Sequence, residues 1–221
     1  MSYRLSAIDC SAKARSGAPP SMAGMTNPPN PPIAPSVRLA MPAEAVQIAE
    51  LQRRCWAADD LERRALDEVG SEEMAQVWHH AITRPPLAHH RVLVASQAFG
   101  EAEPADEPGS TRQRTRVCGF AALGPSDDPD AEVTDSMVAE FRVDPLLRGQ
   151  GHEDRLMHAI VDTMRADGYQ RATWWLRSTD DEQRSWLEAA GWAPDGAHRE
   201  VGTEDGVLRV KQIRLHTDIS E

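Results

Sequence analysis

The chain has 221 residues and a formal net charge of −11, a length that suits one domain with a proper core. No basic stripe is present, which excludes nucleic acid and an anionic membrane as expected partners and favours a cationic small molecule or an amine-bearing peptide. Three widely spaced cysteines form no disulfide framework, and no apolar run is long enough to span a membrane, so a cytoplasmic protein is predicted.

The N-terminal part of the chain differs in composition from the rest. Seven prolines lie between Pro19 and Pro35, among Ser, Gly, Ala and Asn. Such a segment buries too little apolar surface to offset its ordering entropy, so residues 1–36 are predicted to be a disordered tail. The folded domain is predicted to span residues 37–217, and residues 218–221 form a short C-terminal tail.

The domain is predicted to combine strands and helices in a mixed sheet. Strands are expected at 37–40, 91–95, 116–123, 137–143, 173–176, 198–201 and 207–215. Helices are expected to begin at Pro42, Asp59, Ser71 and Asp180 and after Gly151, and polar loops to occupy 100–114 and 124–135. Strands joined by loops pair antiparallel, and the strand–helix–strand unit from 137 to 176 is predicted to be parallel. The fold class is therefore α/β, and Glu204-Asp205-Gly206 is predicted to turn the last hairpin.

One strand–turn–helix segment carries the strongest chemical signal. Phe141 and Val143 alternate with polar residues as in a half-buried strand, which Pro145 ends. Gly149 and Gly151 then remove side-chain bulk where the helix begins. The N–H groups of a helix start form an anion site, although glycines that only allow tight packing are an equal alternative.

The chain resembles the GNAT superfamily of N-acetyltransferases over residues 37–217. The family's acyl-CoA signature is Arg or Gln, two free positions, Gly, one free position, then Gly or Ala. It is matched here by Arg148-Gly149-Gln150-Gly151-His152-Glu153. Val143-Asp144-Pro145 resembles the family's strand ending, and 186–192 resembles its aromatic-Tyr-x-x-x-Gly-aromatic segment. These matches imply an acyl-CoA N-acyltransferase fold, whose twisted, mostly antiparallel sheet is flanked by helices.

The resemblance also implies a function and a site. Acetyl-CoA, without a metal, donates its acetyl group to a primary amine of a small molecule or peptide by direct attack. The 149–154 amides hold the CoA pyrophosphate, and the strand through Phe141 and Val143 splays from the next strand to admit pantetheine. The implied cofactor-binding residues are Phe141, Val143, Arg148, Gly149, Gln150, Gly151, His152, Glu153 and Asp154. In relatives the C-terminal strands are a common pairing surface, which leaves a homodimer open.

Three positions depart from the family pattern. Glu153 replaces the final Gly or Ala of the signature, and with Asp154 it repels a pyrophosphate unless both carboxylates point away, so reduced affinity for CoA is expected. Leu187 stands where many relatives carry a Tyr that reprotonates the leaving thiolate, and Asp180 stands where an Asn is common. A degenerate domain that binds acyl-CoA as a ligand is the alternative function.

Glu140 is the candidate catalytic base, because it lies on the strand beside the expected thioester and some relatives carry an acid there. Alternation places it with Arg142 on the face opposite Phe141, so an ion pair with Arg142 is the alternative. His152 either contacts CoA or faces solvent. The pairs His79-His80 and His89-His90 lack metal-ligand spacing and are expected at the surface or in the acceptor cleft.

Overall fold

The structure is a computed structural model that describes residues 34–104, 111–202 and 209–220. Most of the predicted N-terminal tail and the predicted 204–206 turn lie outside the described residues. The strands are β1 Ser36–Leu39, β2 Arg91–Pro104, β3 Thr111–Pro125, β4 Asp135–Val143, β5 Arg171–Arg177, β6 Ala193–Gly202 and β7 Arg209–Asp218. The helices are η1 Pro42–Glu44, α1 Ala45–Ala57, η2 Glu62–Asp67, α2 Ser71–Thr83, η3 Pro145–Leu147, α3 His152–Ala166 and α4 Asp181–Ala189, where η marks a 3₁₀ helix.

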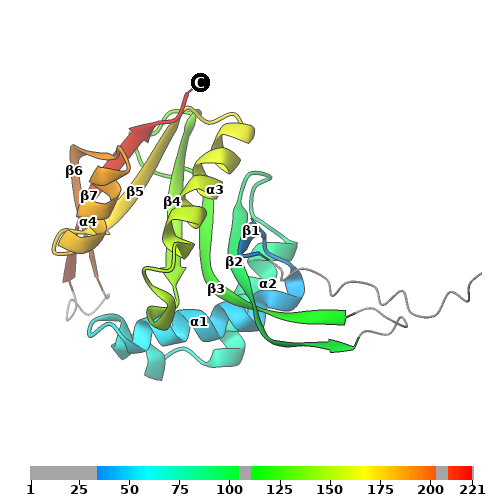
Figure 1. The fold of residues 1–221 in the computed structure, drawn as a ribbon. Coiled ribbons are helices and arrows are strands. Elements are labelled where there is room, and N and C mark those ends of the chain that lie inside the picture. Colours follow the sequence, from blue (N-terminus) through cyan, green and yellow to red (C-terminus); the bar gives the residue numbers. More distant parts are fainter. Residues whose placement is uncertain (1–33, 105–110, 203–208, 221) are drawn as a thin grey trace, which may run out of the picture.

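The described strands form one sheet in the order β1-β2-β3-β4-β5-β7-β6 (Figure 1). The pair β4–β5 is parallel, and each other neighbouring pair is antiparallel. The helix α3 connects the two parallel strands, as a crossover requires. The predicted α/β class and the mostly antiparallel mixed sheet are therefore confirmed.

Alternate residues of the central strands supply two separate cores, one on each face of the sheet. Leu93 and Ala95 of β2 join a cluster with the apolar stripe of α3, which includes Leu156 and Ile160. Val94 and its alternating neighbours face a second cluster, built mainly from α1 and α2. This period of two is what a sheet buried on both faces demands.

Gly119 of β3 is required by close packing. A Cβ atom there would lie 2.9 Å from the Arg142 carbonyl oxygen and 2.9 Å from Leu156 Cδ1. The register between β2 and β3 shifts at the neighbouring residue, Cys118, which has no partner on β2. The glycine therefore brings β3, β4 and α3 together beneath the loop that starts α3.

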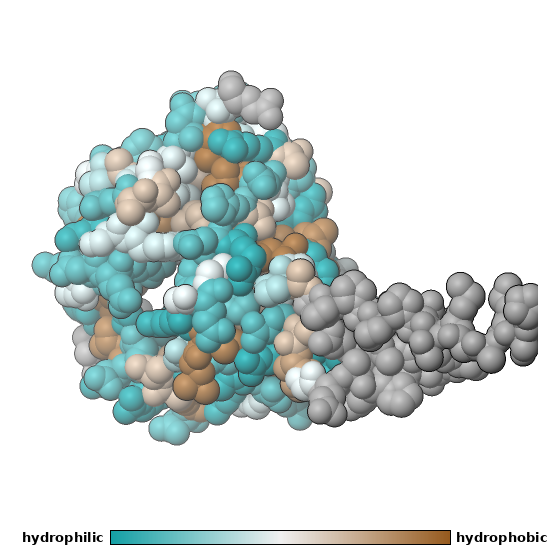
Figure 2. Space-filling view, viewed as in Figure 1, coloured by the Kyte–Doolittle hydropathy of each residue, from teal (hydrophilic) through white to brown (hydrophobic). Residues whose placement is uncertain are grey.

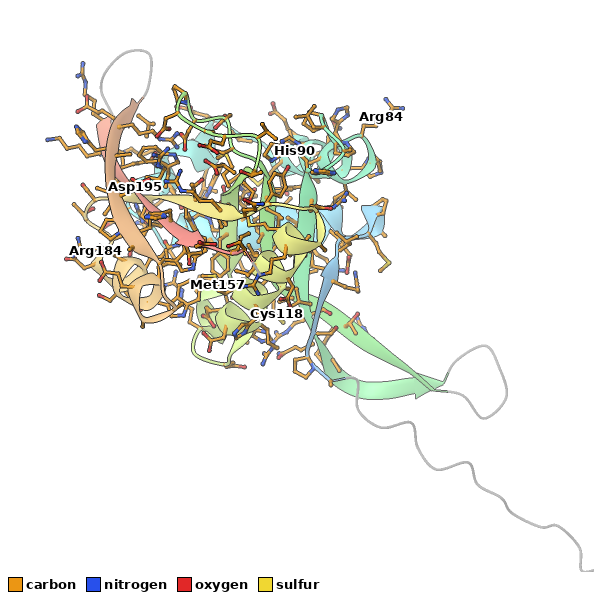
Figure 3. All side chains as sticks on the ribbon, turned by 90° about the horizontal axis from the view of Figure 1, so that it is seen from above. Arg84, His90, Cys118, Met157, Arg184 and Asp195 are labelled. Atoms are coloured by element: carbon orange, nitrogen blue, oxygen red, sulfur yellow. The ribbon has the colours of Figure 1, made fainter. Side chains whose placement is uncertain are left out.

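Two predicted segments differ in the structure. The polar loop expected at 100–114 is largely strand, because β2 and β3 continue as a two-stranded ribbon beyond the body of the domain (Figure 1, Figure 3). The helix expected from Asp59 is the short η2 instead. The Asp59 carboxylate accepts hydrogen bonds from the Leu61 and Glu62 amides, which holds a tight turn where an α-helix would begin.

Candidate acyl-CoA and acceptor site

The parallel strands β4 and β5 separate halfway along their length. Their pairing runs from Asp135 opposite Arg171 to Val138 opposite Trp174 and then stops. Just beyond, the register of β3 and β4 shifts and leaves Ala139 as an extra residue. A bulge bends and twists its strand, so β4 from Ala139 onward leaves β5 and presents a free edge to it. This is the splay that the family resemblance implied.

The loop between β4 and α3 is held open by its two glycines. Gly149 has a φ of +72° and Gly151 a φ of +76°, values that only glycine adopts without strain. The base of the loop is fixed by Asp144, whose carboxylate accepts from the Leu146 amide and pairs with Arg54 of α1 at 3.0 Å. The loop thus delivers a fixed set of backbone amides to the start of α3.

A cavity of about 780 Å³ joins this loop to the free edge of β4. Most of the predicted cofactor-binding residues line it, namely Phe141, Val143, Arg148, Gly149, Gly151, Glu153 and Asp154. Gln150 is exposed, and neither Gln150 nor His152 lines the cavity. The structure therefore brings the two halves of the predicted donor site together.

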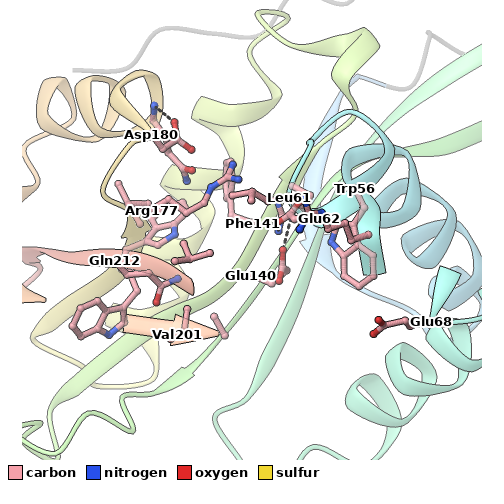
Figure 4. A pocket seen from close by; sticks show the side chains of 18 residues that line it. Trp56, Leu61, Glu62, Glu68, Glu140, Phe141, Arg177, Asp180, Val201 and Gln212 are labelled. Carbon is pink, nitrogen blue, oxygen red and sulfur yellow. Dashed lines mark hydrogen bonds and ion pairs between the residues drawn. The ribbon is translucent and has the colours of Figure 1, made fainter. Parts of the chain in front are cut away.

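A second cavity, of about 570 Å³, opens on the other side of the splay (Figure 4). Its walls come from η2, β4, β5 and β7, and it includes Glu140 together with Trp56, Trp174 and Trp175. The residues common to both cavities are Glu62, Phe141, Arg142, Arg177, Asp180 and Gln183. The space-filling view shows a hollow through the molecule between the parts that carry α4 and α1 (Figure 2). The two cavities therefore meet at these shared residues, where two reactants can lie beside one another.

A family model described as Acetyltransferase (GNAT) family matches residues 56–192. The chain belongs to this family. The matched segment is more than half of the sequence and contains β2 through α4, with both halves of the donor site. Membership makes this GNAT protein an acyltransferase by class. A comparison with curated proteins found no match.

Solved structures share the fold at low identity. An N-acetyltransferase from Staphylococcus aureus Mu50 is 15% identical, with 85% of this chain and 99% of that chain covered and a TM-score of 0.59. A putative acetyltransferase from Salmonella typhimurium, solved with its cofactor acetyl-CoA, is 16% identical, with 85% and 95% covered and a TM-score of 0.58. A GCN5-related N-acetyltransferase from Kribbella flavida is 19% identical, with 84% and 98% covered and a TM-score of 0.58.

The two first-turn carboxylates of this GNAT loop are turned in different directions. Glu153 Oε1 accepts a hydrogen bond from the Gly149 amide at 3.3 Å, so the side chain points toward the loop. Asp154 Oδ1 accepts from the Trp186 indole at 3.1 Å and is turned toward α4. One of the amides expected to hold phosphate therefore already has an anionic partner, supplied by the residue that departs from the family signature.

The His152 side chain is buried and does not line the donor cavity, so the expectation that it faces solvent is wrong. The side chain is 1% exposed, and its ring contacts Gln97 Oε1 at 3.2 Å through Nε2 and an Arg155 nitrogen at 3.1 Å through Nδ1. Arginine only donates, so Nδ1 accepts and Nε2 carries the proton. Burial and the neighbouring Arg155 lower the pKa of His152. Only its backbone remains a candidate for phosphate contact.

Glu140 forms the predicted ion pair with Arg142 and also lines the second cavity. Arg142 Nε donates to Glu140 Oε1, and Arg142 Nη2 lies 2.6 Å from Glu62 Oε1 of η2. Burial raises the pKa of Glu140, while the adjacent guanidinium opposes that rise. The two alternatives weighed for Glu140 are thus not exclusive, because a carboxylate with a raised pKa at a cavity wall still suits proton transfer.

The remaining departures from the family pattern lie in or near α4. Leu187 is fully buried in the core, so its position offers no proton donor to either cavity. Asp180 caps α4 by accepting from the Gln183 amide at 3.0 Å and lies where the two cavities meet. The Tyr expected in many relatives is therefore replaced here by a core residue.

Two features of the site had no signal in the sequence. Arg177 at the end of β5 pairs with Asp59 at 2.6 Å, which links the α1 side of the splay to the β5 side. Arg177 holds the pKa of Asp59 down to about 2. Cys55 of α1 lines the donor cavity, and its thiol donates to the Val143 carbonyl at 3.5 Å. Contacts between residues so far apart in sequence leave no local pattern to read.

Other side chains that suggested chemistry are placed elsewhere. His79, His80 and His89 are exposed, and the structure shows no group of three or more metal-type ligands within its described ranges. Cys118 is buried in β3. No helix in the described part of the chain is long and apolar enough to cross a membrane.

Proposed function

We propose that this GNAT protein transfers an acetyl group from acetyl-CoA to a primary amine of a small molecule or peptide. The observation that carries the proposal is one cavity that joins the glycine loop to the free edge of β4. That edge accepts pantetheine as an added strand, and the loop amides accept pyrophosphate at a helix start. The acetyl-CoA bound to the Salmonella relative supports the same donor here.

The acceptor enters from the second cavity in this proposal. Two carboxylates, Glu62 and Asp180, line both cavities, and a third, Glu140, lines the second cavity alone. A protonated amine is attracted to such a wall, but only its neutral form attacks a thioester. Glu140 takes the proton, because its raised pKa brings it closer to that of the donor than an ordinary carboxylate. The splay holds both reactants in line.

A binding module without efficient chemistry is the second candidate. It is favoured by the contact of Glu153 with the Gly149 amide, which competes with phosphate, and by Leu187 in place of a proton donor. A CoA thiolate leaves with little help, so the absence of a Tyr does not by itself prevent turnover. The two candidates predict different behaviour toward amines.

Release of free CoA across a panel of amines separates them. The panel contains polyamines, aminoglycosides, amino acids and peptides with free N-termini, and the products are identified by mass. Acceptor-dependent release with an acetylated amine is expected. Binding of acetyl-CoA without any acceptor-dependent release would support the binding module, and no binding at all would refute both candidates.

A further inference from the structure

Arg142 is shared between two carboxylates at the wall of the acceptor cavity. It reaches Glu140 on its own strand through Nε and Glu62 of η2 through Nη2. Figure 4 shows Glu140 and Glu62 converging on one point from opposite elements, while Glu68 lies apart. Each carboxylate uses a single oxygen for this contact.

The second oxygen of Glu62 is buried and unsatisfied. Glu62 Oε2 has no hydrogen-bond partner among the described residues, although Glu62 Oε1 is 2.6 Å from Arg142. A buried charged oxygen without a donor is costly, and a guanidinium satisfies a carboxylate best by two parallel hydrogen bonds. A short rotation that moves Arg142 Nε from Glu140 to Glu62 Oε2 would create that arrangement and release Glu140.

We propose that Glu62 is a positioning residue that draws Arg142 away from Glu140 when the acceptor amine binds. This inference rests on the proposed function, in which the freed Glu140 carboxylate accepts a proton from the ammonium. The nitrogen lone pair left behind then attacks the thioester carbonyl, the C–S bond breaks, and the CoA thiolate leaves and takes the second proton from nitrogen. Arg142 stays paired throughout the exchange, first with both carboxylates and then with Glu62 alone, so no buried charge is stranded.

The other charges around Glu140 do not take over this role. Arg177 is held by Asp59 at 2.6 Å, and Asp180 caps α4. Arg64 of η2 and Glu68, just after η2, line the same cavity but are exposed. Glu62 is therefore the neighbour that can draw Arg142 away from the Glu140 carboxylate. Its negative charge raises the pKa of Glu140, and the guanidinium lowers it.

The test replaces Glu62 by Gln, which keeps the shape and removes the charge. Arg142 then belongs to Glu140 alone, so the pKa of Glu140 is expected to fall by about one pH unit. Carboxyl ¹³C NMR titration measures it directly, and Glu140→Gln identifies the signal by its loss. The apparent pKa of the acid limb of the kcat/KM profile is expected to fall by the same amount. The plateau is expected to fall about threefold, because a weaker base transfers protons more slowly.

Two further variants make the result specific. Glu68→Gln removes a carboxylate from the same cavity without touching Arg142 and is expected to leave the NMR titration of Glu140 unchanged. Glu62→Asp keeps the charge and is expected to restore most of the pKa shift. An unchanged Glu140 pKa in Glu62→Gln would overturn this inference but would leave the proposed function intact. A wild-type protein that releases no CoA with any amine would overturn the proposed function, and Glu62 would have no base to position.

Discussion

Replacing Glu153 by Gly is expected to tighten the binding of acetyl-CoA. The Glu153 carboxylate accepts from the Gly149 amide at 3.3 Å, so this amide must be released before it turns to a phosphate oxygen. A long, partly exposed hydrogen bond of this kind contributes about 0.7 kcal/mol. The departure from the family signature thus acts as an internal competitor for the anion that the loop is built to hold.

Repulsion adds to the effect of that hydrogen bond. A carboxylate about 5 Å from a phosphate charge costs ~0.8 kcal/mol in water. Together the two contributions come to about 1.5 kcal/mol, which corresponds to a Kd roughly tenfold lower in the variant. The added glycine lowers helix stability by up to about 1 kcal/mol, but it does so equally in the free and bound protein.

Isothermal titration calorimetry at low and high salt measures the change. Glu153→Gln keeps an acceptor for the Gly149 amide and removes the charge, so it is expected to recover about half of the gain. Asp154→Asn is the matched control, because that carboxylate faces Trp186. Acetyl-pantetheine has no pyrophosphate, and its affinity is expected to stay the same. Acetyl-CoA that binds Glu153→Gly no tighter than wild type would show that the Glu153 carboxylate does not compete with the pyrophosphate.

Three further predictions concern the base, the ion pair across the splay and the core of α4. Glu140→Gln is expected to lower kcat/KM about 100-fold and to abolish the acid limb of the pH profile, which reflects a Glu140 pKa raised by burial. An unchanged pH–rate profile would exclude Glu140 as the base. Asp59→Asn is expected to lower the free energy of unfolding by about 1–2 kcal/mol at pH 7. Because its folded pKa is depressed to about 2, that stabilisation is present above pH 4 and is lost as the pH falls toward 2. Denaturant titrations of both proteins should therefore converge in acid, and a constant gap would contradict the pairing with Arg177. Leu187→Ala is expected to cost about 3 kcal/mol, since the side chain is fully buried; a loss below 1 kcal/mol by the same titration would be inconsistent with a core role.

Much of the fold was predictable because its signals are local. Alternation of apolar residues marked β4, and the glycines marked the turn into α3, both within a few residues. The crossover rule then made β4 and β5 parallel. The β2–β3 ribbon was missed because its polar residues are typical of a loop. The pairing of two strands depends on backbone hydrogen bonds, which no residue type in the sequence marks.

The geometry of the site was predictable in outline only. The glycine loop and the free edge of β4 follow from segments adjacent in sequence, and the structure places them around one cavity. The contact of Glu62 with Arg142 spans 80 residues and that of Asp59 with Arg177 spans 118, so neither leaves a spacing pattern. The direction of a side chain such as His152 depends on Gln97 of a neighbouring strand, which is set by tertiary packing.

A crystal structure of the protein with acetyl-CoA would show whether the splay between β4 and β5 is the donor site. We expect pyrophosphate on the 149–154 amides, with Glu153 turned away from Gly149. We also expect pantetheine hydrogen-bonded along Phe141 and Val143, and the thioester at the junction of the two cavities, near Glu140. Acetyl-CoA bound away from the splay, or a splay that stays empty at saturating acetyl-CoA, would show that the splay is not the donor site.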